Sequence, residues 1–277
     1  MTDLPPFLSA AELERLDDPV IADVRWTLAG PKRDAYGAGH LPGAVFVDLD
    51  TALSAPASPE RGRHPLPDPL EFAAAMGRLG IDGTRPVVAY DDEGGVHAAR
   101  LVWLLRALGH PAAVLDGGIG AWPGPLSTDA PAPTPVRFAA APWPAWLLAE
   151  IDEVAELAAE ADSGTVVIDA RPAERYRGDD GTDPRAGHIP GARSLPVREH
   201  LRDGALLGVD ELRARFAAVG IEPGTPVVSY CGSGVTGCAN LLVLEHAGLG
   251  VGRLYPGSWS QWAADPARPV ETGDGAR

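Results

Sequence analysis

The stretch RLGIDGTRPVVAYDDEGG at residues 78–95 returns 140 residues later as AVGIEPGTPVVSYCGSGV at residues 218–235. Seven aligned positions are identical: two glycines, an isoleucine, a proline, two valines and a tyrosine. A second motif, GHLPGA at residues 39–44, returns as GHIPGA at residues 187–192. Because separate motifs recur in the same order along the chain, the sequence predicts a duplicated domain.

The length of 277 residues agrees with two domains of ordinary size. Residues 123–144 contain seven prolines, which remove amide donors and favour an extended backbone. We therefore predict a first domain at residues 1–122, a Pro-rich linker at residues 123–144 and a second domain at residues 145–277.

Each half alternates short β-branched runs with helical patterns, which predicts the α/β class with a mainly parallel sheet flanked by helices. Ser9 and Glu12 have the spacing of a helix-capping box. The predicted strands are residues 20–24, 86–90, 166–170 and 226–230, and the predicted helices are residues 70–79, 96–108, 212–219 and 239–246.

Charge and composition exclude several classes of protein. The formal net charge of −15, with no local Lys/Arg cluster, argues against nucleic acid as a partner. An anionic substrate must then be captured by a few local arginines. No run of 18 apolar residues exists, so no membrane span is expected. Two cysteines in one segment and an N-terminal stretch without the features of a targeting signal favour the reduced cytoplasm.

One loop carries the residues that point to chemistry. The predicted strand PVVSY runs into Cys231 and the glycine-rich residues after it, and ligands bind at the carboxyl ends of parallel strands. Gly232 and Gly234 allow the loop to curl and to direct successive N–H groups at the sulfur of Cys231. Together with the start of the following helix, these donors favour thiolate over thiol and predict a nucleophile. The hydroxyls of Ser233 and Thr236 can donate to the same anion.

Two other interpretations of this loop remain open. Cys231 could be an inert buried thiol, as Cys238 inside the following helix is expected to be. A phosphatase loop of the form C-x5-R also curls around a cysteine, but this chain has Gly237 where that loop needs an arginine. Phosphate chemistry would therefore lack its main charged partner.

The loop CGSGVT, the paired GHxPGA motifs and the duplication resemble the tandem-domain rhodanese sulfurtransferases, most of all the 3-mercaptopyruvate sulfurtransferase branch. The resemblance implies two tandem rhodanese-like domains, of which only the second is catalytic. Sulfane sulfur would be carried there as a persulfide on Cys231. At the equivalent position the first half has Asp91, which has no thiol, so that half is expected to be catalytically silent.

The resemblance also implies roles for other residues. Arg175 and Arg185 match positions that bind the substrate carboxylate, and Asp50 would form a relay with Ser233 and Cys231. His64 matches a first-domain position that faces the catalytic loop. The loop residues expected to contact substrate are Gly232, Gly234, Val235 and Thr236. The motifs found in both halves, which contain His40, His188, Asp23 and Asp169, are expected to be structural.

The resemblance implies a transfer of sulfur from 3-mercaptopyruvate, with release of pyruvate, to cyanide, a small thiol or a thiol-carrying protein. Neither a cofactor nor a metal is expected. Thiosulfate is an alternative donor, although this dianion would find neutral residues at Gly232 and Ser233. A non-catalytic module that binds persulfides or anions is an alternative from another class.

Overall fold

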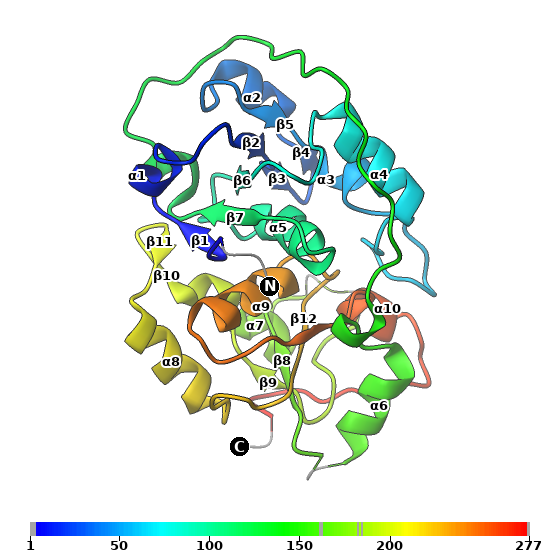
Figure 1. Ribbon diagram of the computed structural model, residues 1–277. Helices are drawn as coiled ribbons and strands as arrows, with labels where there is room; N and C mark the ends of the chain where they lie inside the picture. The colour runs from blue at the N-terminus through cyan, green and yellow to red at the C-terminus, as the bar shows by residue number, and fades with distance from the viewer. Residues whose placement is uncertain (1–3, 161–162, 182, 184, 276–277) are drawn as a thin grey trace. The chain divides into compact units, whose positions relative to one another are not determined.

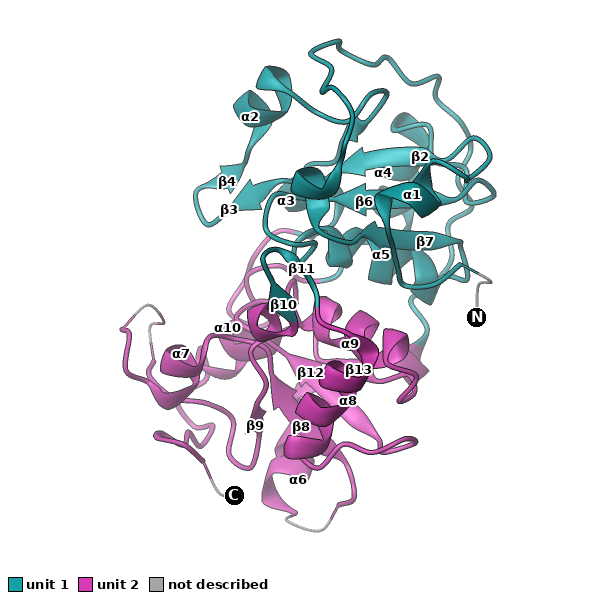
Figure 2. Cartoon of the chain, turned by 90° about the vertical axis from the view of Figure 1, so that its left-hand side faces the viewer, with its two compact units in different colours: residues 1–55, 66–144, 201–206 teal, residues 56–65, 145–200, 207–277 magenta. Residues whose placement is uncertain are grey.

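The computed structural model describes residues 4–160, 163–181, 183 and 185–275 (Figure 1). The chain divides into two compact units, which Figure 2 distinguishes by colour. Unit 1 consists of residues 1–55, 66–144 and 201–206, and unit 2 of residues 56–65, 145–200 and 207–277. Each unit is an α/β structure with a parallel sheet, which confirms the predicted fold class.

The sheet of unit 1 has the strand order β1-β7-β6-β2-β5, and every neighbouring pair is parallel. All four side chains of β6 are buried, as expected of a parallel strand covered on both faces. The strands are β1 (Phe7–Leu8), β2 (Val20–Asp23), β5 (Val45–Phe46), β6 (Val87–Tyr90) and β7 (Ala112–Leu115). Two short antiparallel hairpins complete the strands of unit 1: β3 (Trp26–Thr27) with β4 (Gly30–Pro31), and β10 (Leu201–Arg202) with β11 (Ala205–Leu206).

Local sequence signals fix several helices of unit 1. The capping box of Ser9 and Glu12 is present at the start of α1. The side chain of Asp68 accepts hydrogen bonds from the Leu70 and Glu71 amides at the start of α4, as an N-cap residue does. The helices are α1 (Ala10–Leu13), α2 (Arg33–Ala38), α3 (Leu49–Ala52), α4 (Pro69–Arg78), α5 (Ala98–Ala107) and the 3₁₀ turn η1 (Gly118–Ala121).

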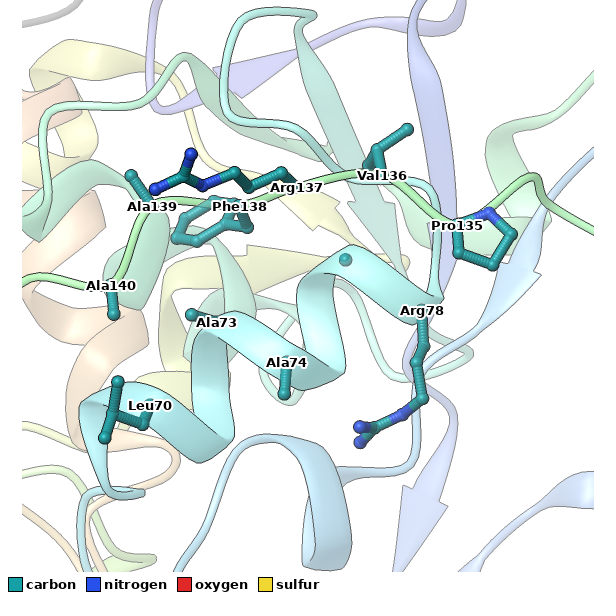
Figure 3. A pocket seen from close by; sticks show the side chains of 11 residues that line it. Leu70, Ala73, Ala74, Arg78, Pro135, Val136, Arg137, Phe138, Ala139 and Ala140 are labelled. Carbon is teal, nitrogen blue, oxygen red and sulfur yellow. The ribbon is translucent and has the colours of Figure 1, made fainter.

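The Pro-rich residues 123–144 form no helix or strand and pack along α4 within unit 1. The Val136 amide donates to the Gly77 carbonyl at 3.0 Å, and a Cβ on Gly77 would lie 2.5 Å from the Val136 oxygen. Phe138 is buried. A groove of about 720 Å³ lies between α4 and this stretch (Figure 3), and no nucleophile or acidic group is among the described residues that line it.

The sheet of unit 2 has the order β13-β12-β8-β9, again with parallel pairs throughout. It repeats the order β7-β6-β2-β5 of unit 1, and the place of β1 is taken by a single parallel bridge between Leu148 and Leu254. The strands are β8 (Val166–Asp169), β9 (Arg193–Ser194), β12 (Val227–Tyr230) and β13 (Arg253–Leu254).

The helix that follows the predicted loop is α9, in which all residues from Gly237 to Leu244 are buried. In the part of the chain that is described, no helix is both long and apolar enough to cross a membrane. The helices are η2 (Ala145–Leu147), α6 (Ile151–Ala159), α7 (Ala173–Arg177), η3 (Val197–His200), α8 (Val209–Ala218), α9 (Gly237–His246) and α10 (Ser258–Trp262).

The recurrent motifs form the same structure in both units. In unit 2, Asp169 at the end of β8 pairs with Arg171, whose Nη2 also donates to the Gly187 carbonyl at 2.8 Å. In unit 1, Asp23, Arg25 and Gly39 make the corresponding contacts. His40 and His188 are buried, and each lies stacked on a tyrosine ring of its own unit. These side chains join the end of a central strand to the GHxPGA turn.

Candidate active site

Cys231 follows β12 directly and is 2% exposed. Its Sγ accepts hydrogen bonds from the Gly234 amide at 3.1 Å and from the Ser233 amide at 3.5 Å. The loop therefore directs backbone N–H groups at the sulfur, as its glycines predict. Such donors stabilise negative charge on the sulfur, which is the state that attacks an electrophilic sulfur atom.

Gly234 is the loop residue that cannot carry a side chain. Its φ is +79°, and a Cβ there would lie 2.4 Å from the Pro256 carbonyl oxygen. Only glycine adopts this backbone conformation at no steric cost. The close approach of residue 256 to the loop thus depends on the absence of a side chain at position 234.

Residues at the start of α10 hold the backbone of Cys231 from the other side. Ser258 Oγ accepts from the Cys231 amide at 3.1 Å, and the Trp259 amide donates to the Cys231 carbonyl at 2.9 Å. The Ser260 amide donates to the Gly232 carbonyl at 3.0 Å. With its own amide and carbonyl both bonded to α10, Cys231 has little freedom to move away from the nest of amides.

Ser233 and His64 form a buried pair beside the nucleophile. Ser233 Oγ and His64 Nδ1 are 2.8 Å apart, and the two residues are 6% and 7% exposed. Residues 56–65 belong to unit 2, so His64 is part of the same unit as Cys231. A hydroxyl hydrogen-bonded to an imidazole can pass a proton to or from a reacting group.

Arg175 lies on α7 with its guanidinium paired to Asp183. The two bonds, from Nε and Nη2, measure 3.0 and 2.5 Å. Asp183 also accepts from Arg171, which is held in turn by Asp169. Burial on its own lowers the pKa of Arg171, but the charge of Asp169 and its hydrogen bonds outweigh burial and raise that pKa above its ordinary value.

Arg63 is a residue of this site that sequence reasoning missed. A Cβ built on Gly232 would lie 3.1 Å from Arg63 Nη2 and 3.3 Å from Arg175 Nη2. The residue next to the nucleophile is therefore approached by two guanidinium groups. Arg63 directly precedes His64, which the sequence had marked, but no pattern in the sequence marked Arg63 itself.

For the other predicted site residues, no hydrogen bond to the sulfur is found among the described residues. Arg185 donates through Nη1 and Nη2 to the carbonyls of Asp265 and Arg268, at 3.1 and 2.7 Å. Val235 is buried. Thr236, half-buried, is the N-cap residue of α9, and its side chain caps no backbone amide. Cys238 is fully buried in α9 and donates to the Gly234 carbonyl.

Asp50 lies on α3 of unit 1, where Trp26 Nε1 donates to its Oδ1 at 2.9 Å. Burial raises the pKa of the Asp50 carboxyl, and the hydrogen bond from Trp26 offsets part of that rise. The expected relay between Asp50 and Ser233 stays a prediction.

In unit 1 the loop equivalent to that of Cys231 holds the side chain of Asp91. Asp91 is fully buried, and its Oδ1 accepts from the Glu93 and Gly95 amides, both at 2.8 Å. Its Oδ2 accepts from the His97 and Ala98 amides at 2.7 and 2.9 Å. A nest for an anion is thus present in unit 1, and a carboxylate of the chain itself occupies it.

Among the described residues, no three histidine, cysteine or acidic side chains come together in a way that could hold a metal ion. Both cysteines are free thiols. The chemistry that the arrangement supports is attack by a thiolate held in a nest of amides, with a buried hydroxyl–imidazole pair and two arginines beside it.

Comparison with known proteins gives the class of protein that this fold and loop define. The rhodanese-like domain matches the chain twice, at residues 9–124 and 153–265. The chain therefore belongs to the rhodanese-like family, with two such domains in tandem.

Individual relatives agree over nearly the whole chain. A Pseudomonas aeruginosa protein named "Probable 3-mercaptopyruvate sulfurtransferase" is 42% identical, over 96% of this chain and 98% of its own. The Arabidopsis thaliana thiosulfate/3-mercaptopyruvate sulfurtransferase 1 is 32% identical, over 93% of this chain and 75% of its own. The crystal structure of SseA from Escherichia coli, described as a 3-mercaptopyruvate sulfurtransferase of the rhodanese fold, has a TM-score of 0.81 at 34% identity and covers 92% of this chain and 99% of SseA. The predicted tandem rhodanese-like organisation and sulfurtransferase class are thereby confirmed.

Proposed function

We propose that this protein takes sulfur from 3-mercaptopyruvate, releases pyruvate, and passes the sulfur from a Cys231 persulfide to a thiol or to cyanide. The observation that carries the proposal is Cys231 Sγ at the end of β12 with the amides of Ser233 and Gly234 directed at it. The names of the relatives support 3-mercaptopyruvate as the donor.

The first half-reaction forms a sulfur–sulfur bond and breaks a carbon–sulfur bond. The Cys231 thiolate attacks the thiol sulfur of 3-mercaptopyruvate, and the electron pair of the broken bond stays with carbon as the enolate of pyruvate. The enolate then takes a proton. Ser233, hydrogen-bonded to His64, is the group that we assign to deliver it.

The second half-reaction returns the enzyme to its starting state. The acceptor, a thiolate or cyanide, attacks the outer sulfur of the persulfide. The acceptor becomes a new persulfide or thiocyanate. The sulfur–sulfur bond to Cys231 breaks, and its electron pair restores the Cys231 thiolate. Atoms and charges balance over the two steps without an outside oxidant or reductant.

The equivalent loop of unit 1 gives an argument for a persulfide on Cys231. A carboxylate oxygen of Asp91 lies two bonds beyond Cβ, as the outer sulfur of a persulfide on Cys231 would. Two of the amides that bind Asp91, those of Gly95 and His97, correspond to Val235 and Gly237 in the second copy. We infer that these two amides bind the outer sulfur. Asp91 then occupies in unit 1 the space that the transferred sulfur takes in unit 2.

The donor carboxylate is assigned to arginines of unit 2. Arg175 has a guanidinium nitrogen close to Gly232, and the position of Arg185 matches one that binds the substrate carboxylate in the family. Each guanidinium can give paired hydrogen bonds to a carboxylate. We place the reaction in the cytoplasm, since both cysteines are free thiols and reduced thiols are the ordinary state there.

The test uses the purified full chain and two cysteine variants. Treatment with 3-mercaptopyruvate should add one sulfur atom to a peptide containing Cys231, seen by mass spectrometry, with one pyruvate released per sulfur. Cys231→Ser should abolish transfer, whereas Cys238→Ser should keep most of it. Equal loss in the two variants, or more efficient turnover of thiosulfate than of 3-mercaptopyruvate by the unaltered chain, would contradict the proposal.

A further inference from the structure

Arg63 is held beside the nucleophile loop by a single residue of α10. Its backbone N–H donates to Ser260 Oγ at 2.9 Å, and the Ser260 N–H donates to the Gly232 carbonyl at 3.0 Å. Gly62, with a φ of +85°, lies so close to the Gly257 carbonyl that a Cβ would come within 2.5 Å of its oxygen. The backbone before Arg63 and the loop of Cys231 therefore keep a fixed relation within unit 2.

Among the described residues, the Arg63 guanidinium beside the loop has no carboxylate partner. Arg171 pairs with Asp169, and Asp183 is shared between Arg171 and Arg175. The Arg63 guanidinium is exposed and, in the described part of the chain, pairs with no carboxylate. Of the two arginines that approach Gly232, Arg175 is thus paired with a carboxylate and Arg63 is not, in a protein whose formal net charge is −15. An anion is the ligand that completes this arrangement.

We propose that Arg63 is a specificity-determining residue, which binds the anionic group of the sulfur donor beside Cys231 and favours donors whose charge lies close to the transferred sulfur. This inference rests on the proposed sulfur transfer. Gly232, the loop residue after the nucleophile, is neutral, and Arg63 supplies from another segment a positive charge that the loop itself lacks. Thiosulfate carries two negative charges next to the sulfur, whereas 3-mercaptopyruvate carries one, remote from its sulfur. Coulomb attraction falls with distance, so Arg63 contributes more to the use of thiosulfate.

The test compares Arg63→Gln, Arg63→Lys and Arg61→Gln with the unaltered chain, using both donors and saturating cyanide. Arg61→Gln is the matched control, because it removes the same charge two residues away in an exposed part of the same segment. For Arg63→Gln we expect kcat/KM to fall at least tenfold with 3-mercaptopyruvate, mainly through KM, and at least threefold further with thiosulfate. Arg63→Lys should recover much of the loss, and Arg61→Gln should stay within threefold of the unaltered chain.

A second readout separates this inference from the proposed function. Pyruvate and sulfate are anions without a transferable sulfane sulfur. Both should protect Cys231 from iodoacetamide in the unaltered chain, and protect it less well in Arg63→Gln. If the unaltered chain released no pyruvate but protection still depended on Arg63, the proposed function would fail and the anion site would stand. Three results overturn the inference itself: activity of Arg63→Gln within threefold with both donors, an equal loss in Arg61→Gln, or an equal loss with the two donors.

Discussion

The substitution Asp91→Asn tests whether the Asp91 carboxylate stabilises the loop of unit 1 that is equivalent to the Cys231 loop. Asp91 accepts four amide hydrogen bonds, two on each carboxylate oxygen. Asparagine keeps one oxygen and presents an NH₂ group in place of the other. Two buried amides would then face a donor instead of an acceptor.

The expected cost follows from that pair of amides. A buried donor left without an acceptor costs about 1–3 kcal/mol. Two of them give a loss of about 3–5 kcal/mol in the free energy of unfolding of unit 1, near the upper end for single substitutions. The neighbouring Asp92 is exposed and bonded to Lys32 at 2.8 Å, so Asp92→Asn is a matched control that should cost about 0.5 kcal/mol.

The assay is hydrogen exchange followed by mass spectrometry in increasing urea, with unit 2 as the internal reference. Peptides from residues 91–107 should lose protection at lower urea in Asp91→Asn, while peptides from residues 231–246 should change far less. Sulfur transfer by the folded variant should stay within twofold. A stability change below about 1 kcal/mol would refute the role of the carboxylate, since no more than one weak hydrogen bond would then be lost. A large drop in the donor-saturated rate would show that unit 1 takes part in the chemistry.

Three further predictions concern unit 2. Arg175→Ala and Arg185→Ala should each lower kcat/KM for 3-mercaptopyruvate by a factor of tens, as expected for the loss of a charge-assisted contact of about 2 kcal/mol. Steady-state kinetics at saturating acceptor measure this, and an unchanged kcat/KM would contradict the assignment. Ser233→Ala should lower kcat for pyruvate release by about 100-fold, with His64→Phe close to it, if the pair delivers the proton. Burial lowers the pKa of His200 from 6.5 to about 3. Below pH 6.5 the unfolded chain therefore binds a proton that the folded chain does not, and stability should fall by about 2 kcal/mol from pH 7 to pH 5. His200→Leu should flatten that slope in urea titrations at the two pH values, and equal slopes would contradict the assignment.

The sequence predicted the fold well because the features that define it are local. The buried runs of β6 and β12 and the capping box at Ser9 depend on neighbouring residues and appear directly in the sequence. The Pro-rich stretch also showed itself by composition. Its packing on α4 could not be predicted, because this depends on a close approach of Gly77 to Val136 over about sixty residues of chain.

The site was predictable where one segment makes it and not where several segments meet. Cys231 and the amides directed at it lie within four consecutive residues, so the glycine pattern was enough. Arg63 reaches Gly232 from a segment more than 160 residues earlier, and no local pattern marks such a contact. Arg171 could have been found, since Asp-x-Arg after a strand recurs in both halves and both arginines bond to the GHxPGA turn.

The two loops differ in how much of the nest their own side chain fills. In unit 1 four amides donate to the Asp91 carboxylate, so these donors are already taken by the chain itself. In unit 2 the shorter Cys231 side chain accepts, among the described residues, hydrogen bonds from the Ser233 and Gly234 amides. The donors further along the loop are then left for the atom that the thiol acquires. An enzyme that carries sulfur between two half-reactions needs such donors for the outer sulfur, because the persulfide must be stable until the acceptor binds. The same nest thus stabilises the fold of one unit and, on our proposal, the covalent intermediate of the other.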